Sequence, residues 1–294
     1  MKKIPLFFAF FFSLLSGYAQ EDKVYSSLDE ALKNPSQVFI LYLNNQKLTV
    51  FPETITRFPN LTTLNIAGNR LSSIPENITS LEQLKELDLS NNRFNTIPET
   101  ITKLVNLAEL DLSSNNLLFI PGTITKLVNL KQLFLNNNKL ASFPDFMTKM
   151  VNLSEVYLYG NLLPFVPESI SKLSNLTEIG LGGNLLTSLP ASMKNMINLK
   201  YLALSYNQFT SVPDCITQLI NLVVLDLNGN KIVSLPQSIG NLTQLEEFYL
   251  ESNKLTTLPE SMTRLTALTT INIKGNPSLK LSPSVKKFIE DKKL

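Results

Sequence analysis

Residues 84–106 read LKELDLSNNRFNTIPETITKLVN, and this pattern recurs along most of the chain. Pro98 belongs to a series of ten prolines spaced 23 residues apart, and Asn92 belongs to a series of ten asparagines with the same spacing. The prolines are Pro52, Pro75, Pro98, Pro121, Pro144, Pro167, Pro190, Pro213, Pro236 and Pro259; the asparagines are Asn69, Asn92, Asn115, Asn138, Asn161, Asn184, Asn207, Asn230, Asn253 and Asn276. A fixed period of this length indicates a solenoid, whose coils stack to bury a common core.

The unit predicts one strand and one short helix in each coil. Its leucines alternate with Glu86 and Asp88, as in a strand with one buried and one exposed face. Asn92 follows at a turn, where a buried amide can donate to and accept from the backbone of neighbouring coils. Pro98 has a fixed φ and no N–H group, which suits the first turn of a helix. We therefore expect a parallel sheet on the inner wall and short helices on the outer wall.

Acidic and basic residues lie four apart in the expected helices, with the acid first. Such a pair stabilises a helical turn by about 0.3 kcal/mol. The pairs are Glu53/Arg57, Glu99/Lys103, Asp145/Lys149, Glu168/Lys172 and Glu260/Arg264. We interpret the basic members as part of a solvated outer face.

The unit resembles the leucine-rich repeat family in its 23-residue, proline-containing form, as in Ras-group and Scribble-type proteins. The matching positions are Leu84, Leu87, Leu89, Asn92, Phe94, Ile97, Pro98, Ile101 and Leu104. The resemblance covers residues 38–279. It implies an α/β class and a right-handed, horseshoe-shaped solenoid, with a concave parallel sheet of about eleven strands and a convex face of short α or 3-10 helices. It also implies partner recognition, although a fold alone does not determine the ligand.

Residues 1–19 have the layout of a secretory signal peptide. Lys2 and Lys3 precede an apolar run at 4–15, and small residues lead to a predicted cut after Ala19. The run is shorter than the roughly 20 residues that span a bilayer, and no second run follows. We expect an exported protein without a membrane span, either periplasmic, on the cell surface or secreted. No cysteine near the cut offers a site for a lipid anchor.

The segments that flank the solenoid predict two helical caps, at residues 20–37 and 280–294. Ser27 and Glu30 match a capping box at the start of the first cap. Gln46 replaces the usual asparagine in the first coil, as terminal repeats often do. We expect the chain and the solenoid to end together, without an appended catalytic domain.

Composition argues against several function classes. Without Lys2 and Lys3, the 26 basic and 24 acidic residues become 24 of each, whereas nucleic-acid binders carry a basic excess. The chain has no histidine, the commonest general base and metal ligand. Cys215, the only cysteine, cannot form an internal disulfide, and beside Asp214 it is not a credible nucleophile. We expect no nucleic-acid partner, metal or cofactor.

The outward strand positions form two rows across the concave wall. The first row is Ile40, Thr63, Glu86, Glu109, Gln132, Glu155, Glu178, Tyr201, Val224, Glu247 and Thr270. The second row is Tyr42, Asn65, Asp88, Asp111, Phe134, Tyr157, Gly180, Ala203, Asp226, Tyr249 and Asn272. Together they hold eight acidic residues and neither lysine nor arginine. Such a one-sided field attracts cationic groups and repels phosphate polymers.

Aromatic residues also gather on this wall. Phe134, Tyr157 and Tyr159 precede Gly180, Gly182 and Gly183 along the coils, and Tyr201 and Tyr206 follow. We expect a depression with aromatic walls that contacts a partner, because tyrosine is enriched at binding hot spots. The predicted partner site comprises Phe134, Glu155, Tyr157, Tyr159, Glu178, Gly180, Gly182, Tyr201, Tyr206, Asp226 and Tyr249.

Several alternatives stay open at this point. Neighbouring rings can simply stabilise the sheet, by about 0.2–1 kcal/mol per pair, and the acids can serve solubility. The rings can instead stack on sugars, which makes glycan binding the second hypothesis. The third is hydrolysis at a secondary acidic patch of Glu86, Asp88, Glu109 and Asp111, since neighbouring rows about 5 Å apart match a retaining carboxylate separation. A flat, open wall is expected not to desolvate these carboxylates. The leading hypothesis is therefore a non-enzymatic module that binds a protein or peptide.

Overall fold

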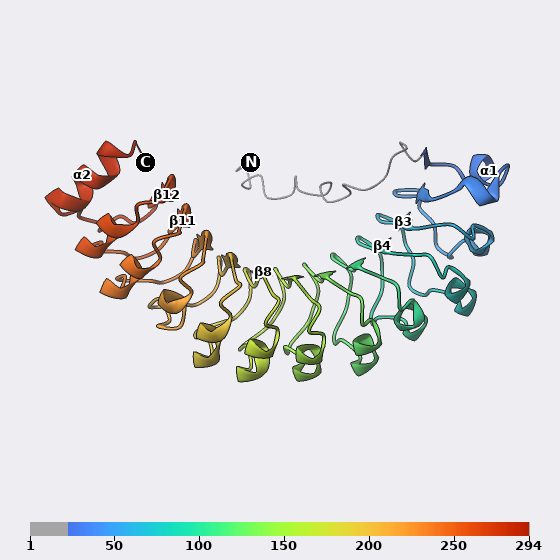
Figure 1. Cartoon of the computed structure of the whole chain (residues 1–294), viewed down its shortest axis with the longest axis horizontal. Coiled ribbons are helices and arrows are strands. Elements are labelled where there is room, and N and C mark those ends of the chain that lie inside the picture. The colour runs from blue at the N-terminus through green and yellow to red at the C-terminus, as the bar shows by residue number, and fades with distance from the viewer. Residues whose placement is uncertain (1–22, 294) are drawn as a thin grey trace.

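The computed structural model describes residues 23–293, which form one open, curved solenoid (Figure 1). Twelve parallel strands form a single sheet whose order follows the chain. The sheet lines the inner wall and short helices line the outer wall (Figure 1). This confirms the predicted α/β horseshoe. The predicted signal peptide lies outside the described residues.

Each coil of the solenoid contributes one strand of three residues. These strands are β2 (Ile40–Tyr42), β3 (Thr63–Asn65), β4 (Glu86–Asp88), β5 (Glu109–Asp111), β6 (Gln132–Phe134), β7 (Glu155–Tyr157), β8 (Glu178–Gly180), β9 (Tyr201–Ala203), β10 (Val224–Asp226), β11 (Glu247–Tyr249) and β12 (Thr270–Asn272). Neighbouring strands pair at an offset of 23 residues, for example Leu87 with Leu110. The eleven predicted strands are therefore present and in register.

A twelfth strand, β1 (Val24–Tyr25), precedes them in the segment that was expected to be only helical. It pairs with β2, and Tyr25 is buried against the first coil. The helix α1 (Leu28–Ala31) follows. Its capping box is half formed: the Ser27 hydroxyl accepts from the N–H of Glu30, at 3.4 Å. The Glu30 carboxylate accepts instead from Lys23, at 2.6 Å.

The outer wall consists of 3-10 helices. They are η1 (Pro35–Gln37), η2 (Glu53–Arg57), η3 (Glu76–Ser80), η4 (Glu99–Lys103), η5 (Gly122–Lys126), η6 (Asp145–Lys149), η7 (Glu168–Lys172), η8 (Ala191–Asn195), η9 (Ile216–Gln218), η10 (Gln237–Asn241) and η11 (Glu260–Arg264). Pro98 lies just before η4, with extended ψ of 134°, and not in its first turn as predicted. Its carbonyl accepts from the N–H of Ile101, at 3.0 Å.

The predicted acid–base pairs do not form. Within residues 23–293, none of the five pairs makes an ion pair, and Lys103 instead contacts Glu76 of the preceding coil. A 3-10 helix has three residues per turn, so residues four apart do not face each other. Lys103 therefore reaches the preceding coil and not the acid of its own helix.

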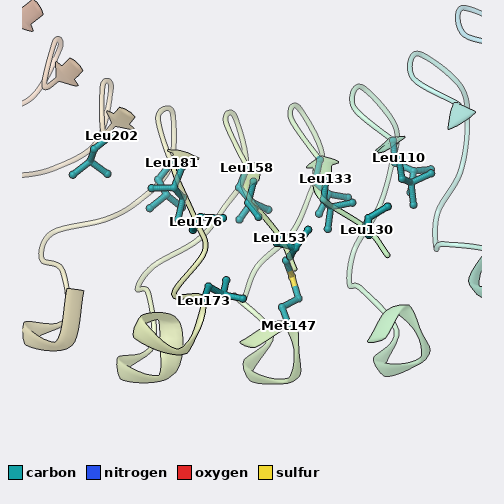
Figure 2. Packing of buried hydrophobic residues seen from close by; sticks show 14 of the residues in the cluster. Leu110, Leu130, Leu133, Met147, Leu153, Leu158, Leu173, Leu176, Leu181 and Leu202 are labelled. Atoms are coloured by element: carbon teal, nitrogen blue, oxygen red, sulfur yellow. The ribbon is translucent and has the colours of Figure 1, made fainter. Parts of the chain in front are cut away.

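Leucines from every coil fill the space between the two walls. Figure 2 shows Leu110, Leu133 and Leu158 from neighbouring coils pointing from the sheet toward the helices. All three are fully buried, as are the larger rings of Phe94 and Phe209. Burial of one such side chain contributes about 2 kcal/mol. Because each coil covers the next, the core is continuous along the arc.

Asparagine side chains join the coils along the core. Asn92 donates to the carbonyls of Ile66 and Leu89, both at 3.1 Å, and accepts from the N–H of Leu71 at 2.9 Å. The same arrangement recurs at each of the ten periodic asparagines, for example at Asn276. Backbone groups at the turn are thereby satisfied, as the sequence predicts.

A second asparagine series lies on the turns before seven of the strands and was not predicted. Asn129 donates to the carbonyl of Val105, at 3.0 Å, and equivalent residues bridge other pairs of coils. The series is Asn60, Asn106, Asn129, Asn152, Asn175, Asn198 and Asn221. Both edges of the sheet are thus tied by side-chain amides, which makes the concave wall a rigid surface.

The two ends of the solenoid are covered differently. Gln46, in place of asparagine, donates to the carbonyl of Ser26 and joins the first coil to the segment before it, at 3.2 Å. At the other end, α2 (Pro283–Asp291) buries Val285 and packs against η11. The division into caps at residues 20–37 and 280–294 and a solenoid at 38–279 stays a prediction. Of the helices that the structure describes, none combines the length and apolar character needed to cross a membrane.

Candidate functional site

Strand pairing brings the two predicted rows together on the concave wall. Glu86 pairs with Glu109, and Asp88 pairs with Asp111. Further along, Glu155 pairs with Glu178 while Tyr157 pairs with Gly180. Like charges therefore stand side by side at two separate places on the sheet. Such pairs are destabilising unless a hydrogen bond, a proton or a counter-charge compensates them.

The secondary acidic patch (Glu86, Asp88, Glu109 and Asp111) is partly withdrawn from water. Burial, together with the nearby charge of Glu86, raises the pKa of Glu109 to about 7. Burial also raises the pKa of Asp111 to about 6, although this residue accepts from the N–H of Ser113 at 2.7 Å. Asp111 is only 7% exposed.

The expectation that this wall leaves carboxylates solvated is therefore wrong. Side chains on adjacent strands are about 4.8 Å apart, so they cover one another even on an open sheet. Asp88 shows the same effect: burial raises its pKa, while the Asn65 amide donates to it at 2.7 Å. The patch holds acidic groups that titrate closer to neutral pH than free carboxylates do.

Aromatic rings cross the sheet from the next strand, β6, onward, where Phe134 pairs with Asp111. The rings of Phe134 and Tyr157 are nearly parallel, with centroids 5.2 Å apart and planes 7° apart. Tyr157 also faces Tyr201 of β9, with centroids 6.4 Å apart and planes inclined by 47°. We call Phe134, Tyr157, Tyr159, Tyr201 and Tyr206 the aromatic cluster. It brings together rings from β6, β7 and β9 and from the turns that follow β7 and β9.

Glycines accommodate three of these rings. A Cβ on Gly180 would lie 2.7 Å from Cδ1 of Tyr157. A Cβ on Gly182 would lie 2.7 Å from Cδ2 of Tyr159, and a Cβ on Gly229 would lie 2.5 Å from Cδ1 of Tyr206. The three pairs are Tyr157/Gly180, Tyr159/Gly182 and Tyr206/Gly229. In each pair the glycine follows the tyrosine by one 23-residue period.

These contacts change the predicted shape of the site. Instead of standing beside an open depression over Gly180 and Gly182, the rings lean over the glycines, and both glycines are buried. A large side chain leans toward the neighbouring glycine, because glycine has no side chain and leaves room for the ring. The signal was present in the sequence as tyrosine followed, one period later, by glycine, and sequence reasoning interpreted it as empty space.

Tyr206 adopts a backbone conformation that is rare for a large residue. Its φ is 54° and its side chain is 61% exposed. Equivalent turn positions hold asparagine, serine or glycine, such as Asn91, Ser114 and Gly160. A bulky residue at positive φ is a genuine outlier, and such strain gathers at functional sites.

Carboxylates border the aromatic cluster. The Tyr157 hydroxyl donates to Glu178, and the Gln132 amide donates to Glu155 at 2.8 Å. Burial raises the pKa of Glu155 and of Asp226, and it raises the pKa of the Tyr157 and Tyr201 hydroxyls as well. The hydroxyls are therefore donors throughout the physiological pH range.

The remaining predicted residue, Tyr249, lies on β11, two strands beyond Tyr201. Its hydroxyl donates to Glu247, at 2.6 Å. Burial raises the pKa of Tyr249, and the neighbouring carboxylate raises it further. Tyr249 thus repeats the tyrosine–carboxylate contact of Tyr157 at a second place on the wall.

The chain also has a cysteine thiol outside the two rows. Cys215 is 5% exposed, and burial raises the pKa of its thiol to about 11. The thiol therefore stays protonated at neutral pH. Within the described part of the chain, no group of three or more cysteines and carboxylates is placed to hold a metal ion. A shallow hollow lies between η6 and η7 on the opposite wall, away from both rows; Phe146, Lys149 and Glu168 contribute to its lining.

Family models extend this description to known proteins. A leucine rich repeat model matches residues 59–117 and 82–140, and a leucine-rich repeat region model matches residues 186–290. The chain belongs to the leucine-rich repeat family. No curated protein matches its sequence.

Solved structures of the same fold include a leucine-rich repeat protein of Leptospira interrogans, with 25% identity over 92% of this chain and 97% of that one, at a TM-score of 0.56. The ectodomain of the Arabidopsis thaliana receptor kinase GASSHO1/SCHENGEN3, in complex with CASPARIAN STRIP INTEGRITY FACTOR 2, is 32% identical over 81% of this chain and 30% of that one, at 0.66. The Arabidopsis receptor kinase HAESA, in complex with the peptide hormone IDA and the co-receptor SERK1, is 29% identical to this chain. The match covers 79% of this chain and 45% of that one, at a TM-score of 0.67. The chain thus spans less than half of the two plant receptors.

Proposed function

We propose that this protein is an exported, non-enzymatic module that binds a protein or peptide partner on its concave wall, centred on the aromatic cluster. One observation carries the proposal: the two rows combine eight carboxylates with half-exposed rings and contain neither lysine nor arginine. A surface of this kind is complementary to a partner that carries positive charge and apolar side chains.

Rigidity supports the same function. Side-chain amides tie both edges of the sheet, so the wall loses little conformational freedom when a partner binds. HAESA, which resembles this chain in fold, is described in complex with a peptide hormone. The likeness adds weight to a peptide or protein as the ligand, and it offers no support for a glycan.

Export is part of the proposal. The predicted signal peptide at residues 1–19 supports it, as does the likeness to the ectodomain of a plant membrane receptor kinase. We therefore place the protein in the periplasm, on the cell surface or outside the cell. Partners should be sought among exported proteins and peptides.

The test is a binding screen of the mature protein against an array of surface proteins, secreted proteins, peptides and glycans. Each ligand found is then measured with the triple variant Tyr157→Ala, Tyr159→Ala and Tyr201→Ala. The matched control is Tyr42→Ala, which removes a second-row tyrosine from β2, far from the aromatic cluster. We expect a protein or peptide whose affinity falls about 100-fold or more in the triple variant and stays unchanged in the control.

Three results would overturn this proposal. Unchanged affinity in a correctly folded triple variant, shown by circular dichroism, would remove the aromatic cluster as the binding site. Binding to glycans alone, insensitive to salt, would establish the glycan hypothesis instead. Release of reducing ends from a glycan panel, abolished by Glu109→Gln, would establish the hydrolase hypothesis and with it a catalytic role for the acidic patch.

A further inference from the structure

Two neighbouring carboxylates at the border of the aromatic cluster have no counter-charge in an ion pair with any residue from 23 to 293. Glu155 and Glu178 are direct neighbours in the first row. Each accepts a hydrogen bond, from Gln132 and Tyr157 respectively, but neutral donors do not cancel the charge. Within residues 23–293 neither glutamate forms an ion pair. A carboxylate has about four acceptor positions, so both retain capacity for a further donor.

Aromatic surface lies directly beside this pair. Tyr157 is on the same strand as Glu155, and its hydroxyl contacts Glu178. Tyr201 follows on β9, 6.4 Å from Tyr157 between centroids. A group that binds here therefore meets two negative charges and two ring systems at once. Cations are attracted to the faces of aromatic rings within about 6 Å, and to carboxylates.

We infer that this place is an arginine subsite: the partner inserts an arginine side chain that contacts the rings of Tyr157 and Tyr201 and is bound by Glu155 and Glu178. The inference rests on the proposed function, because it names the partner group that the concave wall selects. Arginine fits better than lysine, since a guanidinium is planar, stacks on aromatic rings and presents a fork of donors to neighbouring carboxylates.

Gly180 is the residue that positions the subsite. The Tyr157 ring leans over it, backed by Phe134 on the other side and held at its hydroxyl by Glu178. A methyl group on Gly180 would lie 2.7 Å from the ring and would push it out of this position. Gly180 contributes neither a charge nor a ring to the subsite. A change in affinity when Gly180 is substituted therefore reports on the placement of the Tyr157 ring alone.

The experiment is selection of a random library of displayed 12-residue peptides on the mature protein, followed by affinity measurements with synthetic peptides. We expect arginine to be enriched in the selected peptides. Changing that arginine to citrulline, which keeps the shape and removes the charge, lowers affinity about 100-fold, and changing it to lysine lowers affinity about tenfold. The double variant Glu155→Gln and Glu178→Gln binds the arginine and citrulline peptides about equally.

Two matched controls separate the subsite from general charge and stability. Glu86→Gln with Glu109→Gln removes two first-row carboxylates elsewhere and keeps the preference for arginine. Gly180→Ala lowers affinity for the arginine peptide about tenfold. Gly122→Ala changes nothing, since its Cβ would meet only Phe146, at 3.9 Å.

Failure of this inference is distinct from failure of the proposed function. Peptides that are selected without arginine, or an arginine preference that survives in the Glu155/Glu178 variant, overturn the subsite and leave peptide binding intact. The absence of any bound peptide in the library, together with a silent protein array, overturns both.

Discussion

The acidic patch and the aromatic cluster occupy the same two rows of one sheet, yet they treat paired carboxylates in opposite ways. In both places, first-row glutamates stand side by side, Glu86 with Glu109 and Glu155 with Glu178. The second row differs. Beside Glu86 and Glu109 it has two further acids, Asp88 and Asp111. Beside Glu155 and Glu178 it has Tyr157 and Gly180.

The second row decides how the negative charge is accommodated. In the acidic patch, burial and neighbouring charges raise the pKa of Glu109 to about 7, so this region takes up a proton near neutral pH. In the aromatic cluster, a tyrosine hydroxyl donates to Glu178 and aromatic surface lies alongside. One region compensates its charges internally with protons, and the other, on the inference drawn above, takes an external cation.

The largest expected effect tests whether the two regions share one scaffold. Asn115 follows β5 and Asn161 follows β7, and each makes the same buried contacts; Asn161 donates to Leu135 and Leu158, both at 3.0 Å. Replacing either by alanine leaves buried backbone groups without partners and lowers the free energy of unfolding by about 3 kcal/mol. Urea denaturation of both variants should give equal losses.

The control for that measurement is Asn106→Ala, which removes a single exposed contact to the carbonyl of Glu82 and should cost less than about 1 kcal/mol. A loss at Asn115 with none at Asn161 would mean that the aromatic cluster lies on a differently stabilised part of the solenoid. The comparison of the two regions would then reflect the scaffold as well as the side chains.

The second prediction concerns pH. Because the pKa of Glu109 is raised to about 7 in the folded chain and is near 4.5 when unfolded, the folded state binds more protons between these values. Stability should therefore be highest near pH 5 and fall as pH rises through 7. Glu109→Gln should weaken this dependence, leaving the part due to Asp111, whose pKa is raised to about 6, and should raise the free energy of unfolding at pH 8 by about 1–2 kcal/mol, after allowance for solvent screening. Thermal denaturation between pH 5 and 8 measures it.

Glu155→Gln is the matched substitution in the aromatic cluster. Burial also raises the pKa of Glu155, but the Gln132 amide donates to the carboxylate and offsets part of that effect. The gain at pH 8 should be clearly smaller than for Glu109→Gln. Equal gains would show that hydrogen bonding does not distinguish the two regions, and the contrast drawn above would fail.

Most of the fold follows from the sequence because its information is periodic. The spacing of Asn92 and Pro98 determines the coil, and the coil determines which residues become neighbours across strands. The 3-10 character of the outer helices could not be predicted, since a five-residue segment carries too little pattern to separate it from an α-helix. The contact between Lys103 and Glu76 depends on that difference.

The rows of the site were predictable, but the behaviour of their side chains was not. Composition and period place Tyr157 beside Gly180, whereas the direction of the ring depends on which neighbour leaves room for it. The raised pKa of Glu109 likewise depends on its burial and on the nearby charges of Glu86 and Asp111, which are set by packing between coils. Sequence periodicity identifies neighbours, and side-chain volume then sets their geometry.

The smallest expected effect separates stability from binding at the edge of the aromatic cluster. Tyr206 has a φ of 54°, whereas the acidic patch has asparagine or serine at the same turn position, as at Asn91 and Ser114. Tyr206→Asn should therefore raise the free energy of unfolding by about 0.5–1 kcal/mol, because asparagine tolerates positive φ and little buried surface is lost from a side chain that is 61% exposed.

The same substitution should lower partner affinity, since it removes an exposed ring of the aromatic cluster. Ser114→Asn, at a residue with the same φ of 54°, is the control in the other region and should change stability by less than about 0.5 kcal/mol and leave binding unaltered. Melting temperature and affinity are measured on both variants. A loss of stability in Tyr206→Asn would mean that contact of the ring with Gly229 outweighs the backbone strain, and that the tyrosine is retained for packing. A gain in stability with a loss of affinity means that the strained turn serves recognition.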